Sequence, residues 1–485
     1  MGPCTMTWVR EQASALVAEM TGDPFGSFSA SVYETGRVVS LMPSLDGHDE
    51  RVRYLLRQQR PDGGWGGPGL YGLAPTLSAV EALLRQPGED ARIAAQRGLE
   101  SLVDNGMVPD TVAVEIIVPG LVQEINAQLG KALAVPGGMT VETLAKLREM
   151  MDRGLALPDK LLHSLEAFGS SARGAGFVEP TEYGVGCSPA ATASWLGDGK
   201  AHPYLAAVQD PETRAVPVAA PLATFERAWV LSTLAGVGVP CTVPGDVVDW
   251  LAAEFGESGV AGGVGLPPDA DDTAAALHAL AKLGRPRSTD TLRGYRVEDH
   301  FATFADERTP STTTNAHVLQ ALGASREGHR EVMSKLALWL RDRQERDGSW
   351  QDKWHASPYY ATVCCAVALA EHGDECTASS VRDAVGWVLA NQRPDGSWGR
   401  WAGTFEETAY AVQILLRTNV SHEAIPEAAA RGCAFLFQNQ DAEHPPLWHD
   451  KDLYTPLRIV RAEGLAAMYL GLANAEVARL LAYSR

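Results

Sequence analysis

A tryptophan motif that recurs along the chain restricts its fold more than any other feature of the sequence. The copies share the pattern Gln-x-x-Asp-Gly-x-Trp and occupy Gln59–Trp65, Gln344–Trp350 and Gln392–Trp398, with a degraded copy ending at Trp448. The Gly suits a tight turn, the Asp can cap the next segment, and the Trp can fasten neighbouring helical hairpins or, alternatively, bind a ligand. The last two full copies begin 48 residues apart, about the length of a helix pair, so the motif favours stacked helical repeats.

The remaining sequence also carries a helical pattern. Apolar residues recur at i, i+3 and i+4 in segments such as 141–154 and 330–344, Gly and Pro separate these segments, and no convincing alternating strand occurs. Because the chain has 485 residues and the first copy of the motif lies far from the others, we expect two domains, with a break near 214–221. The predicted fold is all-α, with many helices forming a toroid in each domain.

Charge and composition argue against several classes of function. The net charge of −19 disfavours nucleic acid as a partner and gives no general attraction to anionic membranes. A polyanionic ligand would need a local group of basic residues or a metal ion. Seven cysteines without a CxxC pair, an N-terminus without a signal-peptide pattern and apolar runs too short to cross a bilayer lead us to expect a cytoplasmic protein without a membrane span.

Three carboxylates, Asp269, Asp271 and Asp272, directly precede the helical segment 273–283. Taken alone, this pattern is typical of residues that cap a helix, and a metal site would need His or Cys ligands that are not spaced nearby. A third interpretation is chemical. A carboxylic acid held neutral by its carboxylate neighbours can protonate a carbon–carbon double bond, and a helix N-terminus stabilises the conjugate base.

Such a site would also have to stabilise carbocations, which aromatic faces do through their quadrupole. The C-terminal half carries aromatic clusters at 352–362 and 398–410. We take Trp354, Tyr359, Tyr360 and Trp401 as candidate substrate-binding residues, with ordinary core packing as the alternative.

Seven segments, in order along nearly the whole chain, resemble those of class II terpene cyclases of the bacterial copalyl diphosphate synthase type. They are SVYETGRV at 31–38, VAVEIIVPGLVQE at 112–124, CSPAATASWL at 187–196, ATFERAWVLSTLAGVGV at 223–239, PDADDTA at 268–274, STTTNAHVL at 311–319 and LWHDKDLYTP at 447–456. The resemblance implies two α/α-barrel domains, β and γ, without a class I α domain and with the active site between them. It places the first helix of β in 1–44, an inserted γ domain in 45–218 and the rest of β, with the acid motif, in 219–485.

The resemblance also implies residue roles. Asp271 would donate the proton, while Asp269 and Asp272 would polarise and hold it. Asn315 would hydrogen-bond the acid, directly or through a water molecule, with Ser311 one turn earlier on the same side. His317, two positions after Asn315, is expected to point elsewhere and to be structural.

The reaction implied is protonation of the terminal alkene of geranylgeranyl diphosphate and cyclisation to a bicyclic copalyl or labdane-type diphosphate. The diphosphate is kept, which agrees with the lack of a D-D-x-x-D motif in the sequence. One alternative is a C15 enzyme that converts farnesyl diphosphate to drimenyl diphosphate. Another is a non-catalytic toroid that binds prenyl chains. A protein prenyltransferase subunit would need an Asp/Cys/His zinc site that the sequence does not suggest.

The family's acidic segment for Mg²⁺ and diphosphate is altered in this chain. Only Glu100, Asp104, Asp110 and Glu115 remain, at other spacings. Mg²⁺ is still the expected cofactor, with Glu100 and Asp104 as candidate ligands. For the diphosphate, Lys451 is the candidate cation, followed by Arg458 and Arg461. A downstream class I synthase or phosphatase is the expected partner enzyme.

Overall fold

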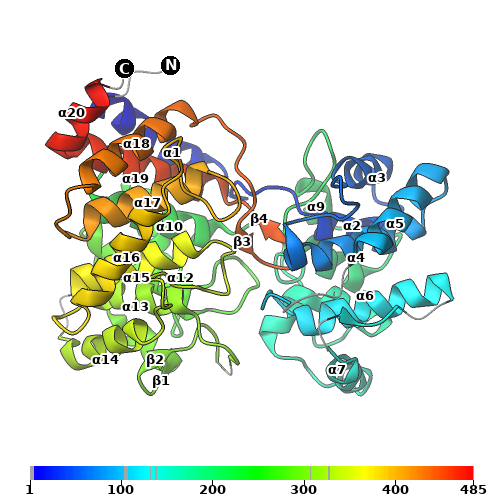
Figure 1. Cartoon of the computed structure of the whole chain (residues 1–485). Helices are drawn as coiled ribbons and strands as arrows, with labels where there is room; N and C mark the ends of the chain where they lie inside the picture. Colours follow the sequence, from blue (N-terminus) through cyan, green and yellow to red (C-terminus); the bar gives the residue numbers. More distant parts are fainter. Residues whose placement is uncertain are drawn as a thin grey trace.

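The computed structural model describes residues 5–102, 108–130, 133–136, 139–305, 307–325 and 328–483. Their helices form two lobes, each with its own hydrophobic core (Figure 1). The larger lobe contains α1 (Met6–Gly22), α10 (Ala223–Val237), α11 (Gly245–Ala253), α12 (Ala270–Lys282), α13 (Thr312–Ala324), α14 (Arg330–Arg341), α15 (Pro358–His372), α16 (Ala378–Ala390), α17 (Phe405–Arg417), α18 (Ile425–Gln438), α19 (Leu457–Ala473) and α20 (Ala475–Tyr483).

The smaller lobe consists of the segment that lies between α1 and α10. It contains α2 (Val32–Leu41), α3 (His48–Arg57), α4 (Leu73–Leu84), α5 (Glu89–Ser101), α6 (Val114–Leu129), α7 (Glu142–Asp152), α8 (Pro189–Leu196), α9 (Pro203–Ala207) and the 3-10 segments η1 (Gly69–Gly72) and η3 (Asp159–Ala172). The larger lobe adds the 3-10 segment η4 (Thr289–Tyr295) and two short antiparallel hairpins, β1 (Arg296–Val297) with β2 (His300–Phe301) and β3 (Trp448–His449) with β4 (Leu453–Tyr454).

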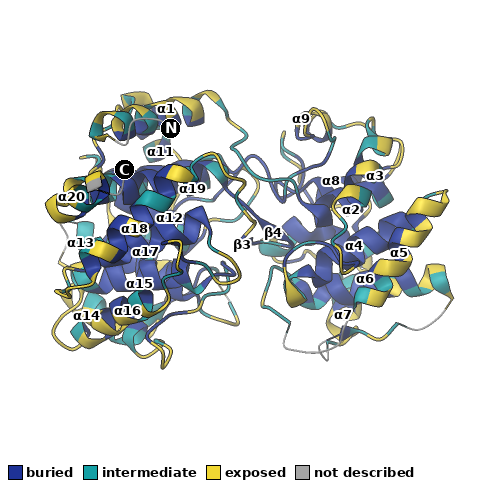
Figure 2. Cartoon of the chain, turned by 45° about the horizontal axis from the view of Figure 1, so that its top comes forward, coloured by how far each residue is buried: buried dark blue, intermediate teal, exposed yellow. Residues whose placement is uncertain are grey.

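Each lobe is a closed ring of helices. In the larger lobe α10, α12, α13, α15, α17 and α19 contact one another in that order, and α19 closes the ring against α10. In the smaller lobe the ring runs through α2, α4, α6, η3 and α8 and returns to α2. Outer helices such as α5 and α14 cover the rings and carry most of their exposed residues on the side facing solvent (Figure 2). The predicted all-α fold of two toroids is confirmed.

The tryptophan motifs fasten these rings as predicted. Trp65, Trp350 and Trp398 are fully buried, and each indole N–H donates to a carbonyl of the preceding helix at 2.7–2.8 Å. The motif Gln also donates to a carbonyl in the turn and to one in a helix further along the chain, which is α5 for Gln59 and α16 for Gln344. The turn Gly has a φ near +90° in all three copies, which favours glycine. The degraded copy differs, because Trp448 belongs to β3 and does not donate to a helix carbonyl.

The chain crosses between lobes earlier than expected. Side chains of α1 share the core of the larger lobe, whereas Val32, Tyr33 and Val39 of α2 belong to the core of the smaller lobe. The crossing therefore lies between α1 and α2, and a first segment of 1–44 is too long. The return crossing near 218 agrees with the cores, since Val218 and Ala219 pack in the larger lobe. Among the described helices, none is by itself long and apolar enough to span a membrane.

Candidate active site

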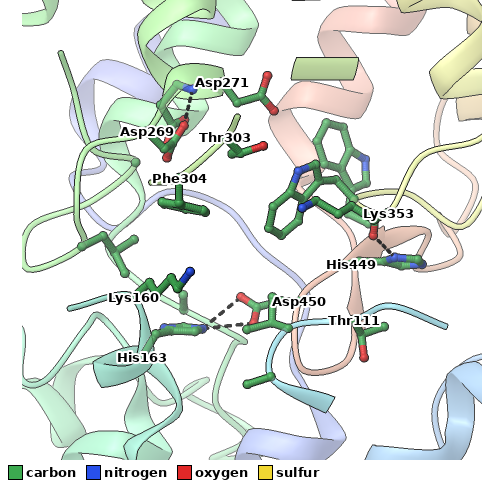
Figure 3. A pocket seen from close by; sticks show the side chains of 18 of the residues that line it. Thr111, Lys160, His163, Asp269, Asp271, Thr303, Phe304, Lys353, His449 and Asp450 are labelled. Carbon is green, nitrogen blue, oxygen red and sulfur yellow. Dashed lines mark hydrogen bonds and ion pairs between the residues drawn. The ribbon is translucent and has the colours of Figure 1, made fainter. Parts of the chain in front are cut away.

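A cavity of about 330 Å³ is lined by residues of both lobes. Figure 3 shows Asp269 and Asp271 on one side of this cavity and Lys160, His163 and Asp450 on the opposite side. We call the first group, together with Asp272, the acidic end of the cavity. We call the second group the basic end. The β3–β4 hairpin of the larger lobe reaches toward the smaller lobe beside the cavity (Figure 1), and its side chains form part of the wall.

The acidic end is built on the N-terminus of α12. Asp269 is the N-cap, and its Oδ1 accepts a hydrogen bond from the backbone N–H of Asp272 at 2.8 Å. Asp271 and Asp272 lie in the first turn, and all three aspartates line the cavity. The capping interpretation is therefore correct for Asp269, and the other two carboxyls are left for chemistry.

Burial determines the protonation of the acidic end. Burial raises the pKa of Asp269 to about 7. Burial, reinforced by the charge of Asp269, raises the pKa of Asp272 well above its ordinary value. Asp272 Oδ1 is also buried without a hydrogen-bond partner in the described parts of the chain. These two carboxyls are therefore suited to hold a proton at neutral pH.

His317 of α13, expected to be structural, is the side chain that contacts the acid. Its Nδ1 lies 2.7 Å from Asp271 Oδ1, and its Nε2 lies 3.5 Å from the thiol of Cys364. Burial opposes a charged imidazole, but the charges and hydrogen bonds of Asp271 and Cys364 together outweigh burial and raise the pKa of His317 well above its ordinary value. His317 can therefore donate a charged hydrogen bond to Asp271.

Among the described residues, Asn315 makes no direct hydrogen bond to the acid. Its Oδ1 accepts from the backbone N–H of Phe301, and its Nδ2 donates to the carbonyls of Phe301 and Ser311. Asn315 thus anchors the β1–β2 hairpin to α13. Ser311 caps α13 and donates to Asp352 Oδ1 at 2.9 Å, so it also serves the local backbone.

An aromatic wall borders the cavity. Of the expected aromatic residues, Trp354 and Tyr360 line it, whereas Tyr359 packs against Trp387 and Trp401 is 40% exposed beside Tyr71. The remaining aromatic lining residues were not predicted. Phe225 and Trp229 lie in the quoted segment 223–239, Trp448 and Tyr454 lie in 447–456, and Phe304 lies outside the quoted segments. The Trp229 N–H donates to the Tyr360 hydroxyl at 3.1 Å, which links two sides of the wall.

Lys451 is not available to bind a diphosphate. Its ammonium is fully buried and is paired with the carboxylates of Glu34 and Glu166, both from the smaller lobe. Burial opposes the charge, but Glu166 and Glu34 outweigh burial and raise the pKa of Lys451. Its contacts with His163 and Ser188 complete a buried ion cluster that ties the lobes together.

The two arginines that were expected after Lys451 are also engaged elsewhere. Arg458 pairs with Glu226 and Asp23, and Arg461 pairs with Glu19. These contacts tie α19 to α10 and to the α1 region. The cavity instead contains cations that sequence reasoning missed, which are Lys160, Arg308 and Lys353. Arg308 lies 3.1 Å from Glu115, and Lys353 is paired with Glu307.

Comparison with known proteins identifies the family. Residues 290–456 match the model of the squalene-hopene cyclase C-terminal domain. The ent-copalyl diphosphate synthase of Streptomyces sp. (strain KO-3988) is 45% identical over 504 residues, covering 96% of this chain and 98% of the relative. The labda-7,13-dienyl diphosphate synthase of Streptomyces clavuligerus is 40% identical, covering 95% and 93%. The solved ent-copalyl diphosphate synthase from Streptomyces platensis superposes with a TM-score of 0.91 at 44% identity, covering 96% of this chain and 99% of that one.

This chain belongs to the class II terpene cyclases. The expected family, fold and type of enzyme are confirmed, and the relatives named above are diterpene cyclases of the copalyl diphosphate synthase type.

The cyclase has few residues that fit a magnesium ion. Within the described ranges no three His, Cys, Asp or Glu side chains are grouped to hold a metal. Glu100 is exposed and accepts a hydrogen bond from Gln96, and Asp104 lies outside the described residues. Asp110 and Glu115 do line the cavity, and one or two carboxylates are enough when substrate phosphates supply the other ligands.

Proposed function

We propose that this cyclase converts geranylgeranyl diphosphate to a bicyclic copalyl-type diphosphate by protonation, with the diphosphate retained. The observation that supports this most is the pairing of a protonatable acidic end with a basic end across one aromatic-walled cavity. The hydrocarbon terminus of a linear substrate would meet the acid while its diphosphate meets the cations.

Asp271 is the proposed proton donor: it is neutral in the state that donates, and the Asp271 carboxylate beside His317 is the state after the proton has left. Its proton adds to the terminal alkene, the resulting tertiary cation is attacked by the next double bond, and a second closure gives a bicyclic cation. Loss of one proton then forms a new alkene, so the product is an isomer of the substrate. His317, bonded to Asp271 Oδ1, stabilises the carboxylate that remains after the proton leaves.

Asp269 and Asp272 position the donor Asp271 and limit the negative charge beside it. Asp269 orients the turn through its cap, and a proton held by the Asp269–Asp272 pair keeps further negative charge away from Asp271. Removing that charge makes proton release from Asp271 easier. The aromatic faces of Trp229, Tyr360 and Trp448 would stabilise the cations in the absence of water.

The proposed diphosphate site consists of Lys160 of the basic end and the two other cavity cations, Arg308 and Lys353. Asp110 and Glu115 would hold Mg²⁺ together with the diphosphate, and the ion would supply charge neutralisation there. We expect EDTA to raise the KM several-fold rather than abolish turnover, because lysine and arginine remain in place. Complete loss of turnover, restored by Mg²⁺, would contradict this division of roles.

The test is incubation of the purified chain with C20 and C15 prenyl diphosphates, followed by mass spectrometry before and after phosphatase treatment. We expect a C20 bicyclic diphosphate whose mass equals that of the substrate. Turnover of farnesyl diphosphate alone would favour the drimenyl alternative, and no cyclised product from either would favour a prenyl-binding toroid. Because the diphosphate is kept, a class I synthase or a phosphatase would have to consume the product.

A further inference from the structure

One buried carboxylate outside the cavity accepts hydrogen bonds from Trp448 of the aromatic wall and from two rings behind that wall, those of Tyr410 and His355. Glu406 lies in the first turn of α17, and its Oε1 accepts from Trp448 Nε1 at 2.7 Å and from the Tyr410 hydroxyl at 2.8 Å. His355 Nε2 lies 3.1 Å from the same oxygen. Glu406 is almost fully buried and is not among the described residues that line the cavity.

The backbone defines the role of His355 in this arrangement. The N–H of Ser357 donates to His355 Nδ1 at 3.0 Å, so Nδ1 accepts and the proton of a neutral imidazole is on Nε2. His355 therefore donates to Glu406, as Trp448 and Tyr410 do. Three donors that converge on one oxygen match an acceptor-only carboxylate.

The three rings held by Glu406 surround a single cavity residue, Tyr360. His355 stacks on Tyr360 with centroids 4.7 Å apart and planes at 27°, and Trp448 lies 4.7 Å from the same ring. Tyr410 lies at 5.5 Å. These three neighbours come from separate segments of the chain. By binding all three, Glu406 fixes the rings that set the orientation of Tyr360.

Comparison of the tryptophan motifs indicates that this arrangement serves more than packing. Trp65, Trp350 and Trp398 donate to helix carbonyls and are buried in their hairpins. Trp448, from the degraded copy, lines the cavity and donates to a carboxylate instead. A carboxylate at the N–H increases the electron density of the indole, whose face would border the cation.

We propose that Glu406 is a positioning residue that fixes and polarises the Tyr360–Trp448 wall, and thereby determines which carbocation loses its proton. This inference rests on the proposed cyclisation. A misplaced wall would let intermediate cations lose a proton early or capture water, so the variety of products would increase while the substrate still binds.

Glu406→Gln tests this inference, because it keeps the shape and one acceptor oxygen but removes the negative charge that strengthens all three hydrogen bonds. With geranylgeranyl diphosphate we expect kcat to fall about tenfold at nearly constant KM, since the interaction acts in the transition state. After phosphatase treatment we expect new bicyclic or monocyclic alkenes and alcohols beside the main product, detected by gas chromatography and mass spectrometry.

Glu407→Gln is the matched control. Glu407 is adjacent, equally buried and bonded to Ser357, Thr404 and the N–H of Arg400, and within the described part of the chain it does not hydrogen-bond to the wall rings. It should lower thermal stability to a similar extent and keep a single product. If Glu406→Gln does not fold, Tyr410→Phe removes one donor to Glu406 outside the main cavity and should give the same side products in smaller amount.

An unchanged product at unchanged kcat from Glu406→Gln, or from Tyr410→Phe where the former does not fold, would overturn the positioning role. Side products in equal measure from Glu407→Gln would also overturn it, since any buried change would then have the same effect. A wild-type chain that does not cyclise the substrate would instead overturn the proposed function, and this inference with it.

Discussion

The pKa of a buried aspartate is shifted in opposite directions at the two ends of the cavity. At the acidic end, burial raises the pKa of Asp269 to about 7. At the basic end, burial also opposes ionisation of Asp450, but His163 and Lys451 together outweigh burial and hold the pKa of Asp450 below its ordinary value. The nearby cations, rather than burial itself, thus decide which carboxyl keeps a proton. One cavity can therefore contain both a carboxyl that keeps its proton and a carboxyl that stays ionised.

Removal of the acid should give the largest effect. We expect Asp271→Asn to lower kcat by about 10²–10⁴-fold, because general acid catalysis contributes on that scale. The Tm should stay near that of the wild type, since Asp271 is not the helix cap. Asp290→Asn, an exposed aspartate in η4, is the control and should keep full turnover. Full turnover by a folded Asp271→Asn enzyme would remove Asp271 from the mechanism.

The buried ion cluster at the basic end should control stability rather than catalysis. Lys451→Met leaves Glu34 and Glu166 buried without their cation, so we expect the free energy of unfolding to fall by about 3–5 kcal/mol in urea titrations. Adding Glu34→Gln should restore part of the loss. A decrease below about 1 kcal/mol together with a large rise in KM would indicate that Lys451 binds substrate after all.

Lys160 lines the same end of the cavity, but its substitution should weaken substrate binding rather than lower stability. We expect Lys160→Gln to raise the KM for the prenyl diphosphate about tenfold with little change in kcat or Tm. The loss should shrink at high salt, which screens the wild-type attraction. Lys146→Gln, on the exposed surface of α7, controls for net charge. Equal KM values for both variants would move the diphosphate site away from Lys160.

The smallest expected effect is on the pH dependence of turnover. Because the pKa of Asp269 is raised, the pH profile of activity should decline on its alkaline side. Asp269 holds its proton below about pH 7 and loses it above, which places another negative charge beside Asp271. Turnover should therefore fall as pH rises through 7, by at most about tenfold per unit. The folded state binds a proton that the unfolded chain lacks between about pH 4 and 7, so the Asp269 contribution to stability also decreases as pH rises through this window. Asp269→Asn keeps a capping side chain and should lose this decline near pH 7, whereas a profile identical to the wild type would contradict the assignment.

Local patterns were sufficient to predict the fold. The Gln-x-x-Asp-Gly-x-Trp copies require a tight turn, a buried indole and a partner helix, and the structure satisfies all three requirements in each full copy. The position of the three aspartates at the start of α12 was also predictable, since Asp269 has the position of a helix cap.

The partners of the site residues were not predictable, because they depend on helix phase and on contacts between lobes. Asn315 and His317 are two positions apart, which is about 200° around a helix, so only one of them can face Asp271. The resemblance favoured Asn315, and packing of α13 placed His317 there. Lys451 was misassigned for a related reason, since Glu34 and Glu166 come from the other lobe. A local window of sequence contains no information on such a pairing.

The origin of the proton tests the central claim most directly. Cyclisation of geranylgeranyl diphosphate in D₂O should place one deuterium in the bicyclic product, at the carbon that was protonated, and should release no inorganic diphosphate. The same deuterated product should be lost in Asp271→Asn and retained in Asp290→Asn. A product without deuterium, or release of diphosphate at the rate of cyclisation, would show that ionisation rather than protonation starts the reaction.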